Sequence, residues 1–296
     1  MRANRIYFLQ RASLSYLLTG LTFAILWSSA SIAGKFGLHS VEPLLFFTTR
    51  FLLAGFLLLT YAHGIKKQRW PKGREWFNVS VFGAFNTTLY LGLFIIALQS
   101  VAAGITALAI ALNPLLISVM SSLWMKRKVK IHEWISIVLG IAGVAIATYP
   151  LLQTSHASTG GLLILGLAMV TYSIGSVFYS SVTWSLSRIA INGWQVLIGG
   201  LLLVPSAIVF YRGDNHYDLN FVLSLAWLII PVSVFAVQLW LRLLREDAVR
   251  ASLWLFLCPI FGLCFATLLL NEPFTLHTGI GAAVVLLALY IGQKKK

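Results

Sequence analysis

The chain is built from long apolar stretches separated by short polar or charged segments. A bilayer core about 30 Å thick needs about 20 helical residues to cross it, and ten stretches approach that length. They cover residues 14–34, 43–63, 77–98, 101–124, 132–150, 160–181, 189–210, 221–243, 249–270 and 276–292. Helices are expected because unpaired backbone groups are costly in lipid, and the alternating strands of a membrane β-barrel are absent. The pattern predicts an all-α integral membrane protein with ten transmembrane helices.

Composition supports the membrane class independently of the pattern. Hydrophobic residues make up 59% of the 296 residues and charged residues only 10%, whereas soluble domains carry roughly 25% charged residues. The two cysteines, Cys258 and Cys264, lie in one apolar stretch. They cannot form a disulfide framework, and we interpret them as packing residues.

The basic residues predict the orientation in the membrane. With the N-terminus inside, the outer segments hold only Lys35 and Arg212 of the 22 lysines and arginines; Arg50 lies within a span and the others fall in inner segments. This bias follows the positive-inside rule. We therefore expect a multi-pass protein of the cell inner (plasma) membrane with both termini cytoplasmic. The net charge of +14 then reflects contact with membrane lipid, and no nucleic-acid partner is expected.

An internal repeat divides the chain into residues 1–150 and residues 151–296. When the chain is shifted by 145 positions, Asn113-Pro114 falls opposite Cys258-Pro259, and Arg50-Phe51-Leu52 falls opposite Gln195-Val196-Leu197. Each half has five predicted spans. Because five is odd, the halves enter the membrane in opposite directions, which is the inverted-repeat plan of many secondary transporters. The first span has a counterpart in the sixth, so we expect it to be retained rather than cleaved as a signal peptide, despite the arginines before it.

Several motifs in a fixed order resemble a known family. They are Ala24-Ile25-Leu26-Trp27-Ser28, Arg50-Phe51-Leu52-Leu53-Ala54, the run 97–104 with Asn113-Pro114, and Pro259 followed by Leu270-Asn271-Glu272-Pro273. Over essentially its whole length the chain resembles a ten-helix member of the drug/metabolite transporter (DMT) superfamily of the EamA type. The resemblance implies an exporter or exchanger with a central cavity lined by helices 1, 3, 4, 6, 8 and 9. One departure is Arg127, which stands where such proteins often carry a glutamate matching Glu272.

Two prolines at matched depths are candidate hinges. A proline inside a helix removes a hydrogen bond and crowds the preceding turn, and in a membrane the freed carbonyl needs a partner or a water-lined cavity. Pro114 and Pro259 therefore point to a central site with hinges. A static kink of purely structural value is the alternative.

Polar and aromatic side chains deep in the spans are candidate substrate-binding residues. Asn86 and Tyr90 are one turn apart on one helix face, and Trp27 and Trp254 lie too deep for the aromatic belt at the membrane interface. For Asn113 we weigh substrate binding equally with a hydrogen bond between helices, and packing is the alternative for every member. The predicted set is Trp27, Asn86, Tyr90, Asn113, Tyr172, Gln238 and Trp254, with Trp240 beside Gln238.

Arg50 is the charge that lies well within a span. A charge there is costly, so it normally snorkels to the interface, pairs with another group or marks a transport pathway. The family pattern also places an arginine here, so a structural role joining helices stands beside anion binding as an interpretation.

The motifs that the sequence lacks narrow the possible classes of function. No acidic residue lies deep in a span, no Walker-type nucleotide loop occurs, and the histidines lack metal-ligand spacing, so no cofactor or metal is expected. The leading hypothesis is a secondary transporter that exports a small organic metabolite, such as an amino acid, by alternating access between the two repeats. The alternative is an intramembrane enzyme, a protease or lipid-modifying transferase, but the nucleophile, paired-acid and metal motifs of such enzymes are absent. A sensor without transport is weaker, and the sequence leaves open whether the protein is a monomer or a homodimer.

Overall fold

The structure, a computed structural model, describes residues 2–153, 157–213, 215–270 and 273–294. Regular structure in these residues is helical apart from one isolated β-bridge between Val101 and Ala157. The elements are α1 (Arg2–Gly37), α2 (Pro43–Leu59), η1 (Thr60–Ile65), α3 (Arg74–Gly83), η2 (Ala84–Leu89), α4 (Tyr90–Leu98), α5 (Ala103–Ala111), α6 (Asn113–Met125), α7 (Ile131–Gln153), α8 (Thr159–Ser181), α9 (Arg188–Val209), α10 (Leu219–Trp227), η3 (Leu228–Ala236), α11 (Val237–Glu246), α12 (Ala248–Ser252), η4 (Leu253–Phe256), α13 (Leu257–Leu270) and α14 (Leu276–Gly292).

These elements join into ten apolar segments, which confirms the predicted fold class. In the described part of the chain, nine segments are long and apolar enough to cross a membrane: Leu14–Gly37, Pro43–Ile65, Arg74–Leu98, Ala103–Met125, Ile131–Gln153, Thr159–Ser181, Arg188–Val209, Leu219–Glu246 and Ala248–Leu269. The tenth, α14, is an apolar helix of 17 residues, at the short end of the range of about 17 to 25 residues that can span.

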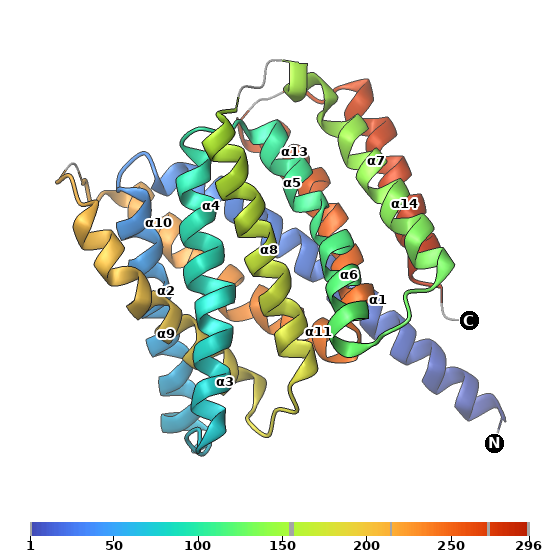
Figure 1. The fold of residues 1–296 in the computed structure, drawn as a ribbon, viewed down its shortest axis with the longest axis horizontal. Helices are drawn as coiled ribbons and strands as arrows, with labels where there is room; N and C mark the ends of the chain where they lie inside the picture. The colour runs from blue at the N-terminus through green and yellow to red at the C-terminus, as the bar shows by residue number, and fades with distance from the viewer. Residues whose placement is uncertain (1, 154–156, 214, 271–272, 295–296) are drawn as a thin grey trace.

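The two halves pack against each other in matched pairs of helices. Helix α7 lies along α14, as Figure 1 shows, and α2 lies along α9. Helix α1, in the first segment of the first half, packs on α13, in the fourth segment of the second half. Helix α8, in the first segment of the second half, packs on α6, in the fourth segment of the first half. The two contacts therefore correspond to each other under the repeat. The start of α1 and the end of α14 lie at the same end of the bundle (Figure 1). This arrangement fits two inverted repeats of five helices.

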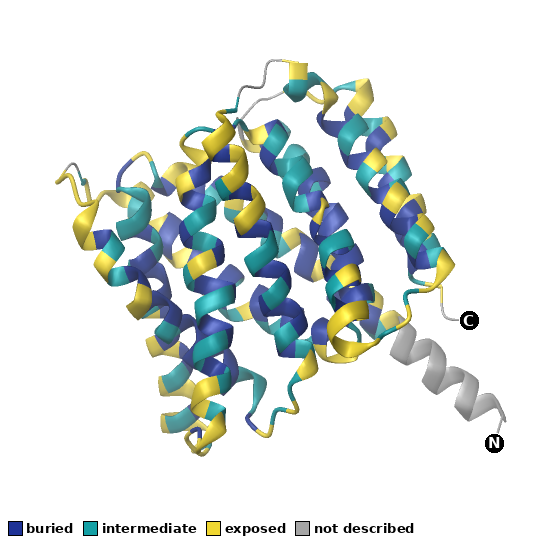
Figure 2. Cartoon of the chain, in the orientation of Figure 1, coloured by how far each residue is buried: buried dark blue, intermediate teal, exposed yellow. Residues whose placement is uncertain are grey.

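The surface of the bundle is apolar along the helices. Exposed residues lie along the outer sides of the helices and at their ends, whereas buried residues face the interior (Figure 2). Many exposed positions are large apolar side chains, among them Phe56, Leu163, Leu268 and Tyr290. Such a surface is stable in a bilayer because lipid tails solvate it.

Two pairs of interruptions correspond between the halves, although the π-helical stretch η1 in segment two has no counterpart in α9. Segments three and eight each contain a π-helical stretch, η2 and η3, and the two stretches begin 144 positions apart. Segments four and nine are broken just before their prolines: α5 ends at Ala111 and α6 restarts at Asn113, and the 3₁₀ turn η4 precedes α13. π-helical turns are rare and occur frequently at functional sites, so these interruptions direct attention to the centre of the bundle.

Glycines allow close contact between α7 and α14. A Cβ added at Gly281 would lie 2.4 Å from the backbone oxygen of Gly143, and one at Gly143 would lie 3.0 Å from the oxygen of Gly281. Small residues let membrane helices approach this closely. Gly143 and Gly281 therefore pack two helices of the same chain.

Arg127 connects the two halves at the end of the bundle that carries residues 66–73 and 126–130, which we call the basic face. Its guanidinium binds Glu133 through two hydrogen bonds of 2.7 Å and donates to Asp247 at 2.9 and 2.8 Å. Burial opposes the charge of Arg127, but the hydrogen bonds to both carboxylates outweigh it and raise the pKa of Arg127 above its usual value. The residue that departs from the family pattern thus forms a contact between the α6–α7 loop and the start of α12.

Candidate functional site

A chain of aromatic rings crosses the centre of the bundle. Trp27 and Phe23 on α1 have ring centroids 5.7 Å apart, and Phe23 stacks on Trp240 of α11 at 4.9 Å. Trp240 stacks on Tyr172 of α8 at 6.0 Å, and Tyr172 lies 4.7 Å from Tyr90 of α4. We call these five residues the aromatic stack. Offset and tilted pairs of this kind contribute about 0.5–1.5 kcal/mol each beyond burial.

The aromatic stack joins the two halves of the molecule. Phe23, Trp27 and Tyr90 belong to the first half, whereas Tyr172 and Trp240 belong to the second. The rings come from segments one, three, six and eight, which are four of the six helices that the family resemblance places around a central cavity. Trp27, Tyr90 and Tyr172, predicted separately from the sequence, therefore lie in one continuous cluster.

Polar atoms along the stack lack partners. The Trp240 Nε1, the Tyr172 hydroxyl and the Asn86 Oδ1 are buried and form no hydrogen bond within the described protein. A Cβ added at Gly175, one turn from Tyr172, would lie 3.3 Å from the Asn86 Cβ, so Asn86 packs against α8 beside the stack. A buried polar atom without a partner is costly. A donor, a hydroxyl and an acceptor at the helix interface could serve a polar small molecule.

Asn113, the first residue of α6, contacts α8 beside Tyr172. Its Nδ2 donates to the Met169 Sδ at 3.2 Å, and its Oδ1 accepts a hydrogen bond from the Ser173 hydroxyl at 3.2 Å. Met169 and Ser173 flank Tyr172 on α8. The structure thus places Asn113 next to the stack and also gives it bonds between helices, so both interpretations of this residue remain compatible with the geometry.

The other two predicted binding residues lie farther along the bundle. The Trp254 ring is 6.4 Å from the Tyr16 ring and lies against Gly20 of α1, where an added Cβ would be 2.0 Å from it. The Gln238 Nε2 donates to the backbone oxygen of Arg188 at 3.2 Å, at the start of α9. Gln238 therefore faces α9 rather than the stack.

Arg50 belongs to a buried polar network next to the stack. Its Nε donates to the Ser233 hydroxyl at 2.9 Å, and the Asn192 Nδ2 donates to the Ser233 backbone oxygen at 2.8 Å. The Gln195 Nε2 donates to the Asn192 Oδ1 at 3.1 Å, and the Gln195 Oε1 accepts from the Thr87 hydroxyl at 2.8 Å and the Asn86 Nδ2 at 3.3 Å. The network connects segments two, three, seven and eight and includes residues of the π-helical stretches η2 and η3.

Comparison with known proteins decides the family. The EamA-like transporter family matches residues 14–149 and residues 159–291. The chain belongs to the EamA-like transporter family. Each matched stretch contains five of the ten apolar segments, which fits the two-repeat architecture of the bundle.

Curated relatives of this EamA-like transporter are themselves named as transporters. It is 26% identical over 271 residues to an uncharacterized transporter of Archaeoglobus fulgidus, covering 91% of this chain and 95% of the relative. It is also 26% identical over 278 residues to the uncharacterized inner membrane transporter YedA of Escherichia coli, covering 93% and 90%. A chloroplastic WAT1-related protein of Arabidopsis thaliana is 28% identical over 277 residues, covering 90% of this chain and 66% of the relative. The protein is therefore a multi-pass membrane transporter.

A solved crystal structure shares the fold of the EamA-like transporter. It superposes with a TM-score of 0.76 and covers 94% of this chain and 97% of the other, at 18% sequence identity. At this identity the likeness shows the fold alone.

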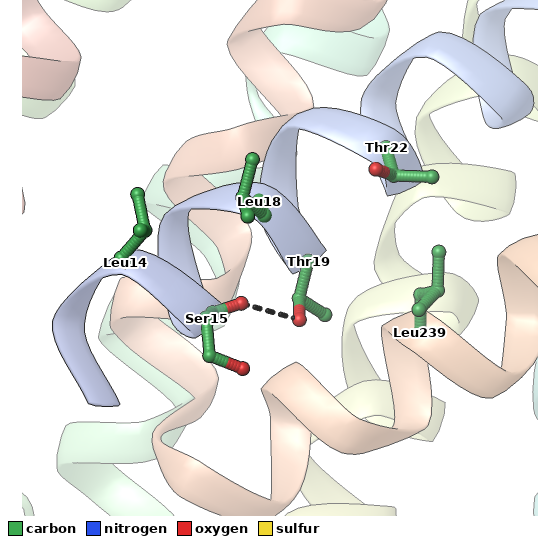
Figure 3. Close-up of a pocket in the computed structure, with 6 residues that line it drawn as sticks. All are labelled: Leu14, Ser15, Leu18, Thr19, Thr22 and Leu239. Atoms are coloured by element: carbon green, nitrogen blue, oxygen red, sulfur yellow. Dashed lines mark hydrogen bonds between the residues drawn. The ribbon is translucent and has the colours of Figure 1, made fainter. Parts of the chain in front are cut away.

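Two hollows lie away from the aromatic stack. One, of about 370 Å³, lies between α1 and α11 and is lined by Leu14, Ser15, Leu18, Thr19, Thr22 and Leu239 (Figure 3). The other, of about 220 Å³, lies among α7, α13 and α14. Neither is lined by a predicted binding residue. The stack itself is closely packed, with Phe23 and Trp240 almost fully buried.

Sequence reasoning missed part of the site. Phe23 links Trp27 to Trp240 but carries no signal, because a phenylalanine in an apolar span is ordinary. Gln195 and Ser233 were not predicted as site residues either. The repeat alignment of Gln195 with Arg50 was the available signal, since it places a polar side chain at the same depth in both halves.

Proposed function

We propose that this transporter exports a small organic metabolite, such as an amino acid, by alternating access between its two inverted repeats. One observation carries the proposal: an aromatic stack with unpartnered polar atoms is shared between the two halves. Apolar rings suit the side chain of an amphipathic metabolite, and the free Trp240 Nε1 and Tyr172 hydroxyl suit its polar group. Ligand sites in proteins commonly combine such surfaces.

Alternating access follows from where the halves meet. Closely packed rings from both halves must separate to admit a substrate, and relative movement of the halves is the motion that separates them. The breaks at Leu112 and at η4, each directly before Pro114 or Pro259, interrupt helices four and nine where such movement needs flexibility. Pro114 and Pro259 are the proposed hinges. The proposed site includes Trp27, Asn86, Tyr90, Asn113, Tyr172 and Trp254. Gln238 faces α9, but it lies on α11 two residues from Trp240, and we include it in the proposed site for that reason.

The proposed location is the inner (plasma) membrane with both termini in the cytoplasm. The cations of the basic face support this orientation, because cytoplasmic loops of membrane proteins are enriched in lysine and arginine. The family and the names of the relatives favour a transporter over the alternative, an intramembrane enzyme.

Comparison of extracellular metabolites tests the proposed function. A bacterial host that produces the protein should release one or a few metabolites faster than the same host with an empty vector. Purified protein in liposomes should then carry those metabolites across the bilayer without added ATP. Folded protein that changes no extracellular metabolite would exclude export.

A further inference from the structure

Arg50 is a buried cation with few partners. The side chain is 5% exposed, and only its Nε is bonded, to the Ser233 hydroxyl. Arginine has five N–H donors and stays protonated in proteins. Within the part of the chain that the structure describes, ion pairs involve Arg69 and Arg127 and none involves Arg50. A buried charge that lacks an opposite charge is strongly unfavourable, so the presence of Arg50 calls for an explanation beyond the helix link.

Neighbouring rings offset only part of this cost. The Arg50 Cζ lies 5.1 Å from the centre of the Phe51 ring and 5.7 Å from that of Phe47, and cation–π contacts of this kind are attractive. They leave the Nη donors without acceptors. Arg50 also lies within electrostatic range of the Tyr90 phenol, and Tyr90 is a member of the aromatic stack. The hydrogen-bond network that begins at Arg50 and Ser233 also reaches Asn86 beside the aromatic stack, so Arg50 lies close to the proposed substrate site.

The inverted repeat provides an internal comparison. Gln195 on α9 is the counterpart of Arg50 on α2, at a shift of 145 positions. Gln195 binds Thr87 in the π-helical stretch η2, and Arg50 binds Ser233 in the π-helical stretch η3. Each residue thus links its own helix to a π-helical stretch in the other half.

This comparison separates the link from the charge. In the second half the neutral amide of Gln195 links its helix to η2. A link of this kind can therefore form without a positive charge. The Gln195 amide oxygen and nitrogen are both bonded, whereas most donors of Arg50 are not. The charge on Arg50 is additional to the structural role that the two positions share.

We propose that Arg50 binds the carboxylate of the transported metabolite. The proposal rests on the proposed function and names the substrate class: a small molecule with one carboxylate and an apolar part that packs against the aromatic stack. A guanidinium forms paired hydrogen bonds to a carboxylate. A single cation matches the single negative charge of a carboxylate better than the nearly double charge of a phosphate.

Arg50→Gln tests the charge without removing the link. The amide nitrogen of glutamine and the Nε of arginine are both attached to Cδ, so glutamine can donate to Ser233 from the same position while the cationic end is deleted. We expect normal abundance of R50Q in the membrane. In the extracellular-metabolite assay, the metabolites released by the wild type should carry a carboxylate, and R50Q should release them at least tenfold more slowly.

Two further variants complete the test. Arg50→Lys keeps a charge but has no donor at the Nε position, so it should transport faster than R50Q. Arg74→Gln removes an exposed cation at the start of α3, next to the basic face, and should export at the wild-type rate. If instead R50Q is lost from the membrane while R50K is abundant, the fold requires the charge and the proposal is wrong. Release of metabolites that lack a carboxylate, or wild-type release by R50Q, also overturns it. A wild-type protein that exports nothing would overturn the proposed function itself.

Discussion

The hydroxyl of Tyr172, a member of the aromatic stack on α8, is buried without a hydrogen bond. An unpaired buried hydroxyl destabilises a protein by about 1–3 kcal/mol. Nothing in the packing of the ring needs the oxygen, since Tyr90 and Trp240 contact the ring itself. The hydroxyl is therefore a good probe for separating stability from transport.

Tyr172→Phe should leave the protein as stable as the wild type or more stable by about 1 kcal/mol. If the hydroxyl binds substrate, the loss of one hydrogen bond should lower flux roughly fivefold to tenfold. Thermal unfolding of purified protein and flux in liposomes measure the two effects. Tyr179→Phe is the matched control, because its buried hydroxyl also lacks a partner but its ring packs on Phe82 and Trp184 away from the stack. Equal flux for both variants would remove Tyr172 from the site.

Asn113→Leu should reduce flux by about tenfold while membrane abundance stays near normal. Few groups are left unpaired in this variant, because a methionine sulfur is a weak acceptor and the Ser173 hydroxyl can bond to its own helix. Ser173→Ala is the control: it removes one partner of Asn113 but keeps the amide, so its flux should stay close to the wild-type value. Quantitative blotting and flux assays distinguish the outcomes, and loss of abundance in both variants would assign Asn113 to helix packing.

At the scale of elements, the sequence predicted existence and length well. Because a span must be apolar over about 20 residues, the predicted ends differ from those of the observed spans by only a few residues, even at the tight turn around Gln99 and Ser100. The exception is the first helix, because α1 begins at Arg2 rather than at the predicted residue 14. The π-helical stretches η2 and η3 were not predicted. Their register depends on partners distant in sequence, such as Gln195 for Thr87 and Arg50 for Ser233, and hydropathy does not record such partners.

Gly281→Ala should destabilise the contact between α7 and α14. The added Cβ would meet backbone atoms, the Gly143 oxygen at 2.4 Å and the Ala147 nitrogen at 2.5 Å, and backbone can move aside only if a helix shifts. We expect a loss of about 1–3 kcal/mol, read as a lower unfolding temperature of the purified protein. Gly262→Ala in α13 is the matched control, because a Cβ there meets nothing within 4 Å. A wild-type unfolding temperature for Gly281→Ala would show that this interface is loose.

For the whole molecule, the repeat was the most informative signal in the sequence. The repeat relates the contact between α1 and α13 to the contact between α8 and α6. It also relates the bond of Arg50 to η3 to the bond of Gln195 to η2. The sequence alignment predicted that these positions correspond, but not that both make the same kind of link. It also gave no sign that Arg127 connects Glu133 to Asp247, because that contact depends on how two loops meet after the halves have packed.

The inverted arrangement makes a strong prediction about topology. If both halves have five crossings, residues 66–73 and 126–130 face one compartment, and the loops near Glu42 and Arg212, which are bonded to each other, face the opposite one. Single cysteines placed at Lys72, Lys128 or Arg212 in a chain with Cys258 and Cys264 replaced by alanine should report this with a membrane-impermeant thiol reagent. In intact cells only the cysteine at position 212 should react, and disruption of the membrane should expose the other two. Reaction of positions 72 and 212 from the same side would mean that the chain between them crosses the membrane an even number of times, whereas segments three to seven give five crossings. A pathway between oppositely oriented halves could not then exist.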